Sequence, residues 1–336
     1  MRCFFSVVLI ALVLSFTCCR DHDQSAGNGK QVFQTLEAIN KKIASDDGNA
    51  DLYEVRAKYY LTDHQFDKAI TDINKAISLK GGQAGYYITL SDIYLLMGKT
   101  QNCGDALKHA LSIDPKNNNA LLKLAKLNLV LKEYKTCFDY LNKAIELEAV
   151  NPQAYFTRAI ALLEKGDTLK AVEDLKRSVD QDQKYYEAYL ELGDLYSKKK
   201  DKMAADYLKN ALRVRPNDKV ALYNLGMFYQ ETGNYNLAVQ TYEVLMKTDS
   251  TYRNAPYNIG YIYLVYTKDF IKAADFFSKA LAVDPGYFEA LFNRGFAYEL
   301  SGQYEKAAAD YHQSLKIKPN YEKAVEGLNR LDRVRK

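Results

Sequence analysis

The chain has 336 residues, of which 48% are hydrophobic and 26% are charged, and its formal net charge is only +4. Because basic and acidic residues nearly balance, the composition argues against a nucleic-acid-binding protein and against electrostatic attachment to an anionic membrane. The length allows two ordinary domains or one repeat array, and the six prolines are few enough to favour long helices.

The first residues, MRCFFSVVLIALVLSFTCC, carry one charge followed by a mainly apolar run. This run is too short to span a bilayer and has the length of a signal-peptide core. The segment resembles a bacterial lipoprotein signal, in which the cysteine after the cleavage site is acylated. We therefore expect a signal peptide over residues 1–18 and a lipid on Cys19, with Cys18 as the alternative site. The other interpretation is an uncleaved anchor or an apolar start that arose by chance.

Residues 19–29 are polar and contain glycine, which predicts a flexible tether. Residues 30–49 predict an N-terminal capping helix, because Phe33, Leu36, Ile39 and Ile43 fall on one face at helical spacing. We expect this helix to cover the first element that follows it.

A period of about 34 residues then runs along the chain. Glycines recur at this interval, each followed three residues later by a tyrosine: Gly193 and Tyr196, Gly226 and Tyr229, Gly260 and Tyr263, Gly295 and Tyr298. Within each period one apolar stripe at helical spacing predicts a first helix, and a second stripe after a short turn predicts another. The pattern resembles the tetratricopeptide repeat, which implies an all-α, right-handed α-solenoid of helix-turn-helix units.

Eight units and a C-terminal helix follow from this spacing. The units cover residues 50–83, 84–117, 118–151, 152–185, 186–218, 219–252, 253–287 and 288–321, and a capping helix covers 322–336. The fifth unit lacks one residue near its turn and the seventh carries one extra there. Terminal helices with a polar outer face keep a solenoid soluble.

The glycine of the last four units, whose place is taken by Ala57, Ser91, Ala125 and Ala159 in the first four, predicts a close contact between helices. Gly295 removes a side chain so that the two helices of its unit can approach, and we expect Tyr298 and Tyr304 to fill the space around that contact. Cys103 and Cys137 lie 34 residues apart, at equivalent places in adjacent units. Packed helices lie about 10 Å apart, beyond disulfide reach, so we expect both thiols to be buried and unpaired.

Motifs for chemistry are absent from the sequence. No pair of histidines has metal-ligand spacing, no CxxC or G-x-S-x-G is present, and the glycine-rich stretch Gly81–Gly85 lacks both a preceding strand and a GK[ST]. We therefore expect no enzyme activity, no metal and no cofactor.

A second stripe on the first helices, offset by one residue from the core stripe, predicts a peptide-binding groove in the last three units. Its residues are Tyr223 and Met227, Tyr257 and Tyr261, and Phe292 and Phe296, beside the asparagines Asn224, Asn258 and Asn293. The repeat resemblance implies that such asparagines bond the backbone of an extended peptide, since an amide both donates and accepts. The alternative is that these residues only pack between units.

The resemblance implies a non-catalytic, lipid-anchored scaffold in the bacterial cell envelope, in envelope assembly or secretion, with a protein or peptide partner and no nucleic acid. The oligomeric state is not predicted. The alternative is a helical lipoprotein that captures a glycan or small ligand, although such proteins need long loop insertions and this chain has almost none.

Overall fold

The computed structural model describes residues 35–334, and every regular element among them is a helix. The predicted signal peptide and tether, both candidate lipidation sites (Cys18 and Cys19) and the first residues of the predicted capping helix lie outside the described residues.

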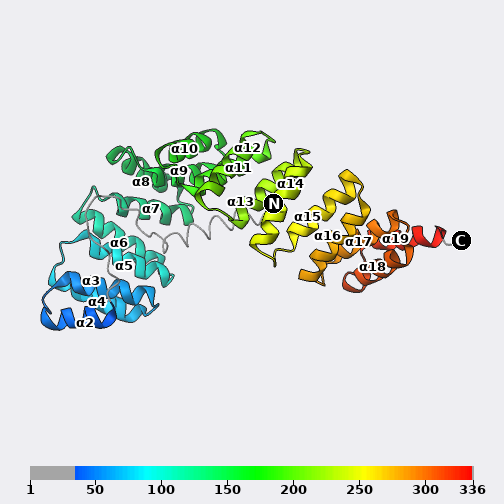
Figure 1. Ribbon diagram of the computed structural model, residues 1–336. Helices are drawn as coiled ribbons and strands as arrows, with labels where there is room; N and C mark the ends of the chain where they lie inside the picture. Colours follow the sequence, from blue (N-terminus) through cyan, green and yellow to red (C-terminus); the bar gives the residue numbers. More distant parts are fainter. Residues whose placement is uncertain (1–34, 335–336) are drawn as a thin grey trace. The chain divides into compact units, whose positions relative to one another are not determined.

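The helices follow one another in pairs, with one single helix before the first pair and one after the last (Figure 1). The first helices are α3 (Ala50–Thr62), α5 (Ala84–Leu96), α7 (Asn118–Val130), α9 (Pro152–Glu164), α11 (Tyr186–Lys198), α13 (Lys219–Glu231), α15 (Asn254–Ile262) and α17 (Phe288–Leu300). The second helices are α4 (Phe66–Leu79), α6 (Thr100–Ile113), α8 (Tyr134–Leu147), α10 (Thr168–Gln181), α12 (Met203–Val214), α14 (Tyr235–Thr248), α16 (Phe270–Val283) and α18 (Tyr304–Ile317). The single helices are α2 (Leu36–Ser45) and α19 (Glu322–Val334). The predicted all-α solenoid is confirmed.

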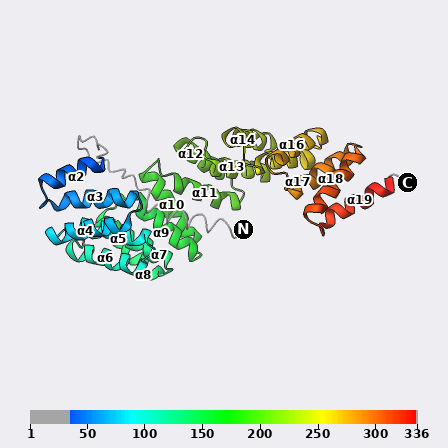
Figure 2. The same cartoon turned by 90° about the horizontal axis from the view of Figure 1, so that it is seen from below.

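The chain divides into two compact units, the first ending at Asp182 and the second beginning at Gln183. Within each unit every helix packs on the next in chain order, which Figures 1 and 2 both show. First helices also contact the first helix of a neighbouring pair, as α3 does with α5 and α7 with α9 in the first unit, and α11 with α13 in the second. The first helices therefore form one layer of each unit.

Glycines in the first helices lie where large side chains of the second helices approach. A β-carbon at Gly295 would lie 3.0 Å from the Tyr311 ring, and one at Gly226 would lie 2.5 Å from the Tyr242 ring. These glycines are therefore packing residues, as the sequence predicts. Of the two tyrosines expected around this contact, Tyr298 packs against the cluster that contains Tyr311, whereas Tyr304 is 37% exposed. The fully buried Tyr311 ring fills the contact itself.

Each pair turns from its first to its second helix through one residue with a left-handed backbone. These residues are His64, Gly98, Lys132, Gly166, Lys200, Gly233, Lys268 and Gly302. Glycine adopts this conformation freely, whereas a residue with a β-carbon is destabilised there by about 1–2 kcal/mol. In four of the eight turns a residue other than glycine is therefore in an unfavourable backbone conformation, and the packing of the helices must offset this conformational free energy.

The structure shows where the fifth and seventh pairs absorb their different lengths. α12 has 12 residues, whereas α10 and α14 have 14 each. In the seventh pair α15 is only 9 residues long and continues into the π-helical segment η1 (Tyr263–Thr267). A π-turn holds one more residue than an α-turn, so η1 accommodates the additional residue.

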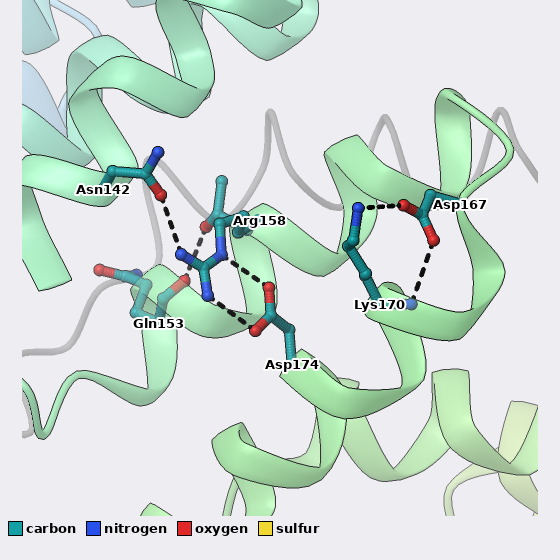
Figure 3. Close-up of polar contacts among 7 residues, drawn as sticks. Asn142, Gln153, Arg158, Asp167, Lys170 and Asp174 are labelled. Carbon is teal, nitrogen blue, oxygen red and sulfur yellow. Dashed lines mark hydrogen bonds and ion pairs between the residues drawn. The ribbon is translucent and has the colours of Figure 1, made fainter.

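Three of the first helices carry an arginine whose side chain bonds to residues of two other helices. In α9, Arg158 donates from Nε and Nη2 to the carboxylate of Asp174 in α10 at 2.7 and 2.9 Å. Its Nη1 donates to Asn142 of α8 at 2.9 Å, so the guanidinium joins two pairs (Figure 3). The same two-bond contact recurs between Arg56 and Asp72 and between Arg294 and Asp310.

The final helix, α19, packs on Tyr311 of α18. Added β-carbons at Gly295 of α17 and Gly327 of α19 would lie 3.0 and 2.6 Å from the Tyr311 ring, so the ring is held between two glycines. Its hydroxyl donates to Glu299 at 2.5 Å, and Arg330 of α19 donates to both oxygens of the same carboxylate at 2.7 and 2.9 Å. These contacts fix α19 over the apolar end of the second unit.

Cys103 in α6 and Cys137 in α8 are buried and unpaired, which confirms the prediction from their spacing. Burial raises the pKa of each thiol to about 12, so both remain protonated at neutral pH.

Candidate functional site

The six apolar residues predicted to line a groove lie on three consecutive first helices. They are Tyr223 and Met227 in α13, Tyr257 and Tyr261 in α15, and Phe292 and Phe296 in α17, and we call them the first-helix stripe. Each packs against the core of the second unit yet remains partly accessible to solvent. The stripe is therefore neither fully buried nor fully exposed.

Two of the predicted asparagines join neighbouring pairs. Asn258 is 9% exposed, and its Nδ2 donates to the Tyr242 hydroxyl at 3.2 Å and lies 3.5 Å from the sulfur of Met227. Asn293 is 8% exposed, and its Nδ2 donates to the Tyr257 hydroxyl at 2.9 Å. The Nδ2 group of each amide therefore already donates a hydrogen bond to the preceding helix pair. Peptide binding by these amides stays a prediction.

The third asparagine, Asn224, differs from the other two. Its Nδ2 is buried and has no hydrogen-bond partner in the part of the chain that the structure describes. The reason lies in the preceding pair, which has Leu208 at the place of Tyr242 and Leu190 at the place of Tyr257. Neither leucine offers a hydroxyl, so the buried amide donor is left unsatisfied at a cost of about 1–3 kcal/mol.

Three tyrosines outside the predicted set contact the stripe: Tyr252, Tyr287 and Tyr321 lie just before α15, α17 and α19. Ring centroids are 5.6 Å apart for Tyr223 and Tyr252, 4.8 Å for Tyr257 and Tyr287, and 5.4 Å for Phe292 and Tyr321. We call these the three ring pairs. A helix-face pattern does not reveal these tyrosines because they precede the helices, but their spacing of 35 and 34 residues is a signal in the sequence.

A carboxylate lies beside these tyrosines. Burial, and then the charge of Glu289 in α17, raise the pKa of Tyr287 to about 12 and also raise the pKa of Tyr321. These phenols therefore stay protonated at neutral pH and can donate hydrogen bonds. Glu289 has no ion pair within residues 35–334, whereas the nearby Arg253 pairs with Asp284.

At the places of the stripe residues, the first unit carries charged residues together with apolar residues that are buried: Ile88, Leu122, Phe156 and Ile160. At the place of the asparagines, Thr89 in α5 donates to Glu54 of α3 at 2.8 Å, and Lys123 in α7 contacts Asp92 of α5 at 2.6 Å. These side chains already satisfy one another across neighbouring pairs. The apolar, partly exposed stripe is therefore a feature of the second unit.

A cavity of about 300 Å³ near Arg158 is lined by charged and apolar side chains. Its charges are largely matched, because Arg158 holds Asp174 and the Lys170 ammonium lies 3.0 Å from the Asp167 carboxylate (Figure 3). Residues 35–334 contain no group of three or more His, Cys, Asp or Glu side chains placed to hold a metal ion. Among the described helices, none has the length and apolarity needed to cross a membrane.

Comparison with known proteins gives one consistent family. Models described as tetratricopeptide repeat match residues 84–117, 156–202, 207–240 and 288–321. The chain is 26% identical over 181 residues to human protein O-mannosyl-transferase TMTC3, covering 52% of this chain and 19% of that protein. It is 24% identical over 195 residues to bovine DnaJ homolog subfamily C member 3, covering 53% of this chain and 39% of that protein. The chain thus spans less than half the length of these relatives.

Among solved structures, the C-terminal part of a TPR repeat-containing protein from Cytophaga hutchinsonii superposes with a TM-score of 0.63 at 17% identity. The match covers 71% of this chain and 98% of the other. At this identity the likeness concerns the fold alone.

Proposed function

Since the chain is a tetratricopeptide-repeat protein, we propose that it is a non-catalytic scaffold that binds an extended segment of a protein partner along the first helices of its second unit. The observation that carries this proposal is the first-helix stripe, with six large apolar side chains partly exposed on three consecutive helices. Contiguous apolar surface of this kind marks binding sites in soluble proteins. Aromatic side chains in such a patch dominate binding energy.

The repeat geometry favours an extended partner over a compact one. Equivalent residues recur at each pair, so a chain running across α13, α15 and α17 meets similar groups at regular intervals. An extended backbone also leaves its own amides free, and tyrosine hydroxyls and asparagine oxygens are suitable partners for them.

We further propose that a lipid on Cys19, or on Cys18, holds this scaffold at a membrane of the bacterial cell envelope. The support is the apolar run that ends in the cysteine pair. Intact mass of the protein in the membrane fraction tests it, with a diacylated N-terminal cysteine as the expected result after removal of residues 1–18 for Cys19 or 1–17 for Cys18. A mature start beyond Cys19, or a protein that fractionates without membrane, contradicts it.

Site-specific photo-crosslinking in intact cells tests the scaffold function. A photo-reactive residue at Tyr261 of the stripe should capture a partner, whereas one at Ile271, which is 75% exposed on α16, should not. Replacing Met227 and Tyr261 together with alanine should lower partner recovery at least about tenfold, because clustered anchors carry most of such binding. Equal capture from both positions, or unchanged recovery in the folded double variant, would remove the proposal.

A further inference from the structure

The three ring pairs give the second unit a repeating aromatic edge, and the following inference rests on the function proposed above. Each ring pair joins a stripe residue of α13, α15 or α17 to a tyrosine that precedes the second helix after it, α15, α17 or α19. The pairs differ in ring geometry, since Tyr257 and Tyr287 stack at 27° whereas Phe292 and Tyr321 meet edge to face at 88°. All six rings remain partly accessible to solvent.

The hydroxyls along this edge are available to a ligand. Tyr223, Tyr252, Tyr287 and Tyr321 make no hydrogen bond through their hydroxyls in the part of the chain that the structure describes, whereas Tyr257 accepts one from Asn293. A ring beside a free O–H donor suits a ligand that presents an apolar face and an unpaired carbonyl together.

We propose that this edge binds a polyproline II segment that carries a basic residue. Successive ring pairs contact every third residue of the segment, and the Glu289 carboxylate forms an ion pair with its basic side chain. A polyproline II helix has no internal hydrogen bonds, so its carbonyls are free to accept from the tyrosine hydroxyls. Proline rings are flat and apolar, and aromatic-lined grooves are the recurring means by which proteins recognise them.

The spacing of the repeats selects this conformation over others. Three residues of polyproline II rise about 9 Å, which matches the roughly 8–10 Å between packed helices. The contacts Asn258–Met227 and Asn293–Tyr257 join α15 to α13 and α17 to α15, so these first helices are direct neighbours. Side chains on one face of a β-strand recur about every 7 Å and fall out of register over three pairs. An α-helix uses its carbonyls internally.

The charges near this edge are the reason to expect a basic residue in the ligand. Glu289 has no ion pair within residues 35–334, although Glu187 at the equivalent place in α11 pairs with Arg215 at 2.6 Å. Lys318, which follows α18, lies over the Phe288 ring at 4.6 Å rather than in an ion pair with Glu289. The neighbouring Arg253 is occupied by Asp284 and by the Tyr287 ring. An arginine or lysine of the ligand therefore finds an unmatched carboxylate beside the second and third ring pairs.

Calorimetric titration of the full chain tests the inference with three synthetic peptides. The first is a proline peptide with one central arginine, the second replaces its prolines with glycine and serine, and the third replaces its arginine with glutamine. We expect the glycine-serine peptide to bind at least about tenfold more weakly, because its flexible backbone must be ordered on binding. Equal affinity for the proline and glycine-serine peptides would overturn the inference.

Variants that keep the rings provide the second arm. Tyr252→Phe with Tyr287→Phe removes two hydroxyls and should weaken binding of the proline peptide about three- to tenfold or more. Glu289→Gln should abolish the preference for arginine over glutamine in the peptide. Tyr304→Phe, on the exposed start of α18, is the matched control and should change nothing. Unchanged affinity in the double phenylalanine variant overturns the inference.

The outcomes also separate this inference from the proposed function. If partner capture from Tyr261 persists while no proline peptide binds, the polyproline inference fails and the scaffold function stands. If capture is independent of the stripe, the proposed function fails, and a tyrosine-dependent titration would then describe a separate site.

Discussion

Asn258 in α15 donates from Nδ2 to the hydroxyl of Tyr242 in α14 at 3.2 Å, and both side chains are buried. Because Tyr242 belongs to the preceding pair, this bond joins two repeats. Asn224 has the same place one repeat earlier, where Leu208 stands in the place of Tyr242, and the Asn224 Nδ2 has no hydrogen-bond partner among residues 35–334. The repeats thus share one helix plan but differ in the bonds between them.

The first prediction compares these two asparagines. Asn258→Ala should lower the free energy of unfolding by about 1–2 kcal/mol, because it removes a satisfied buried hydrogen bond. Asn224→Ala should lower the free energy of unfolding by less than about 0.5 kcal/mol, because the amide that it removes includes a buried donor without a partner. Urea unfolding of both variants checks this. An equal loss in the two would contradict the packing role assigned to Asn258.

Much of the fold was predictable from the sequence because the helix contacts depend on residue size at fixed intervals. Gly226 and Gly295 predict close approach of two helices whatever the opposing residue is, and Tyr242 and Tyr311 are found there. The cysteine prediction succeeded for a similar reason, because equivalent residues of adjacent repeats are held a helix spacing apart.

The candidate site was predictable only in part. The positions of Asn224 and Asn258 follow from the repeat, but the partner of each amide depends on a side chain in the preceding pair, Leu208 in one case and Tyr242 in the other. The pattern of one repeat does not contain that information. Tyr287 escaped prediction because it precedes its helix, where no amphipathic pattern applies.

The second prediction concerns the buried contact between Arg158 and Asp174. Asp174→Ala should lower stability by about 3–5 kcal/mol, because it leaves a largely buried guanidinium with no carboxylate. Thermal and denaturant unfolding would measure the loss, and hydrogen exchange should locate it in α8, α9 and α10, which the contact joins.

The matched control for this prediction is present in the chain itself. At the places of Arg158 and Asp174, the second pair has Leu90 and Ala106, both buried. Arg158→Leu combined with Asp174→Ala should therefore recover most of the stability that Asp174→Ala loses, because an apolar pair replaces an unmatched charge. A double variant as unstable as the single one would show that the ion pair itself, and not the unmatched charge, determines the cost.

The third prediction uses the left-handed turns. Lys132 has φ 61° and Gly166 has φ 86° at equivalent places in successive pairs. Lys132→Gly should raise the free energy of unfolding by up to about 1 kcal/mol, because glycine adopts this conformation without the β-carbon clash. Gly166→Ala should lower it by a similar amount. Denaturant midpoints check both variants, and a shift in the same direction for the two would refute the explanation.

The fourth prediction concerns Glu191 in α11, which has the place that asparagine takes in the three following pairs. Burial raises the pKa of Glu191 to about 7, with Asp194 adding to the rise and Lys198 opposing it. The folded state therefore binds a proton that the unfolded chain, with an ordinary glutamate pKa near 4.5, releases at lower pH.

It follows that this residue favours folding most when protonated. Its unfavourable contribution grows as pH rises from about 4.5 through 7, where the folded state must ionise a partly buried carboxyl. Glu191→Gln should accordingly stabilise the protein at pH 8 by about 1–3 kcal/mol and have little effect at pH 5. Free energies of unfolding measured across this pH range check the sign of the effect.

The control is Glu187→Gln in the same helix, which removes an exposed ion pair with Arg215. It should change the free energy of unfolding slightly and equally at all of these pH values. If the Glu191 variant and the wild type give parallel curves, Glu191 does not titrate in this range, and burial is not raising its pKa as described.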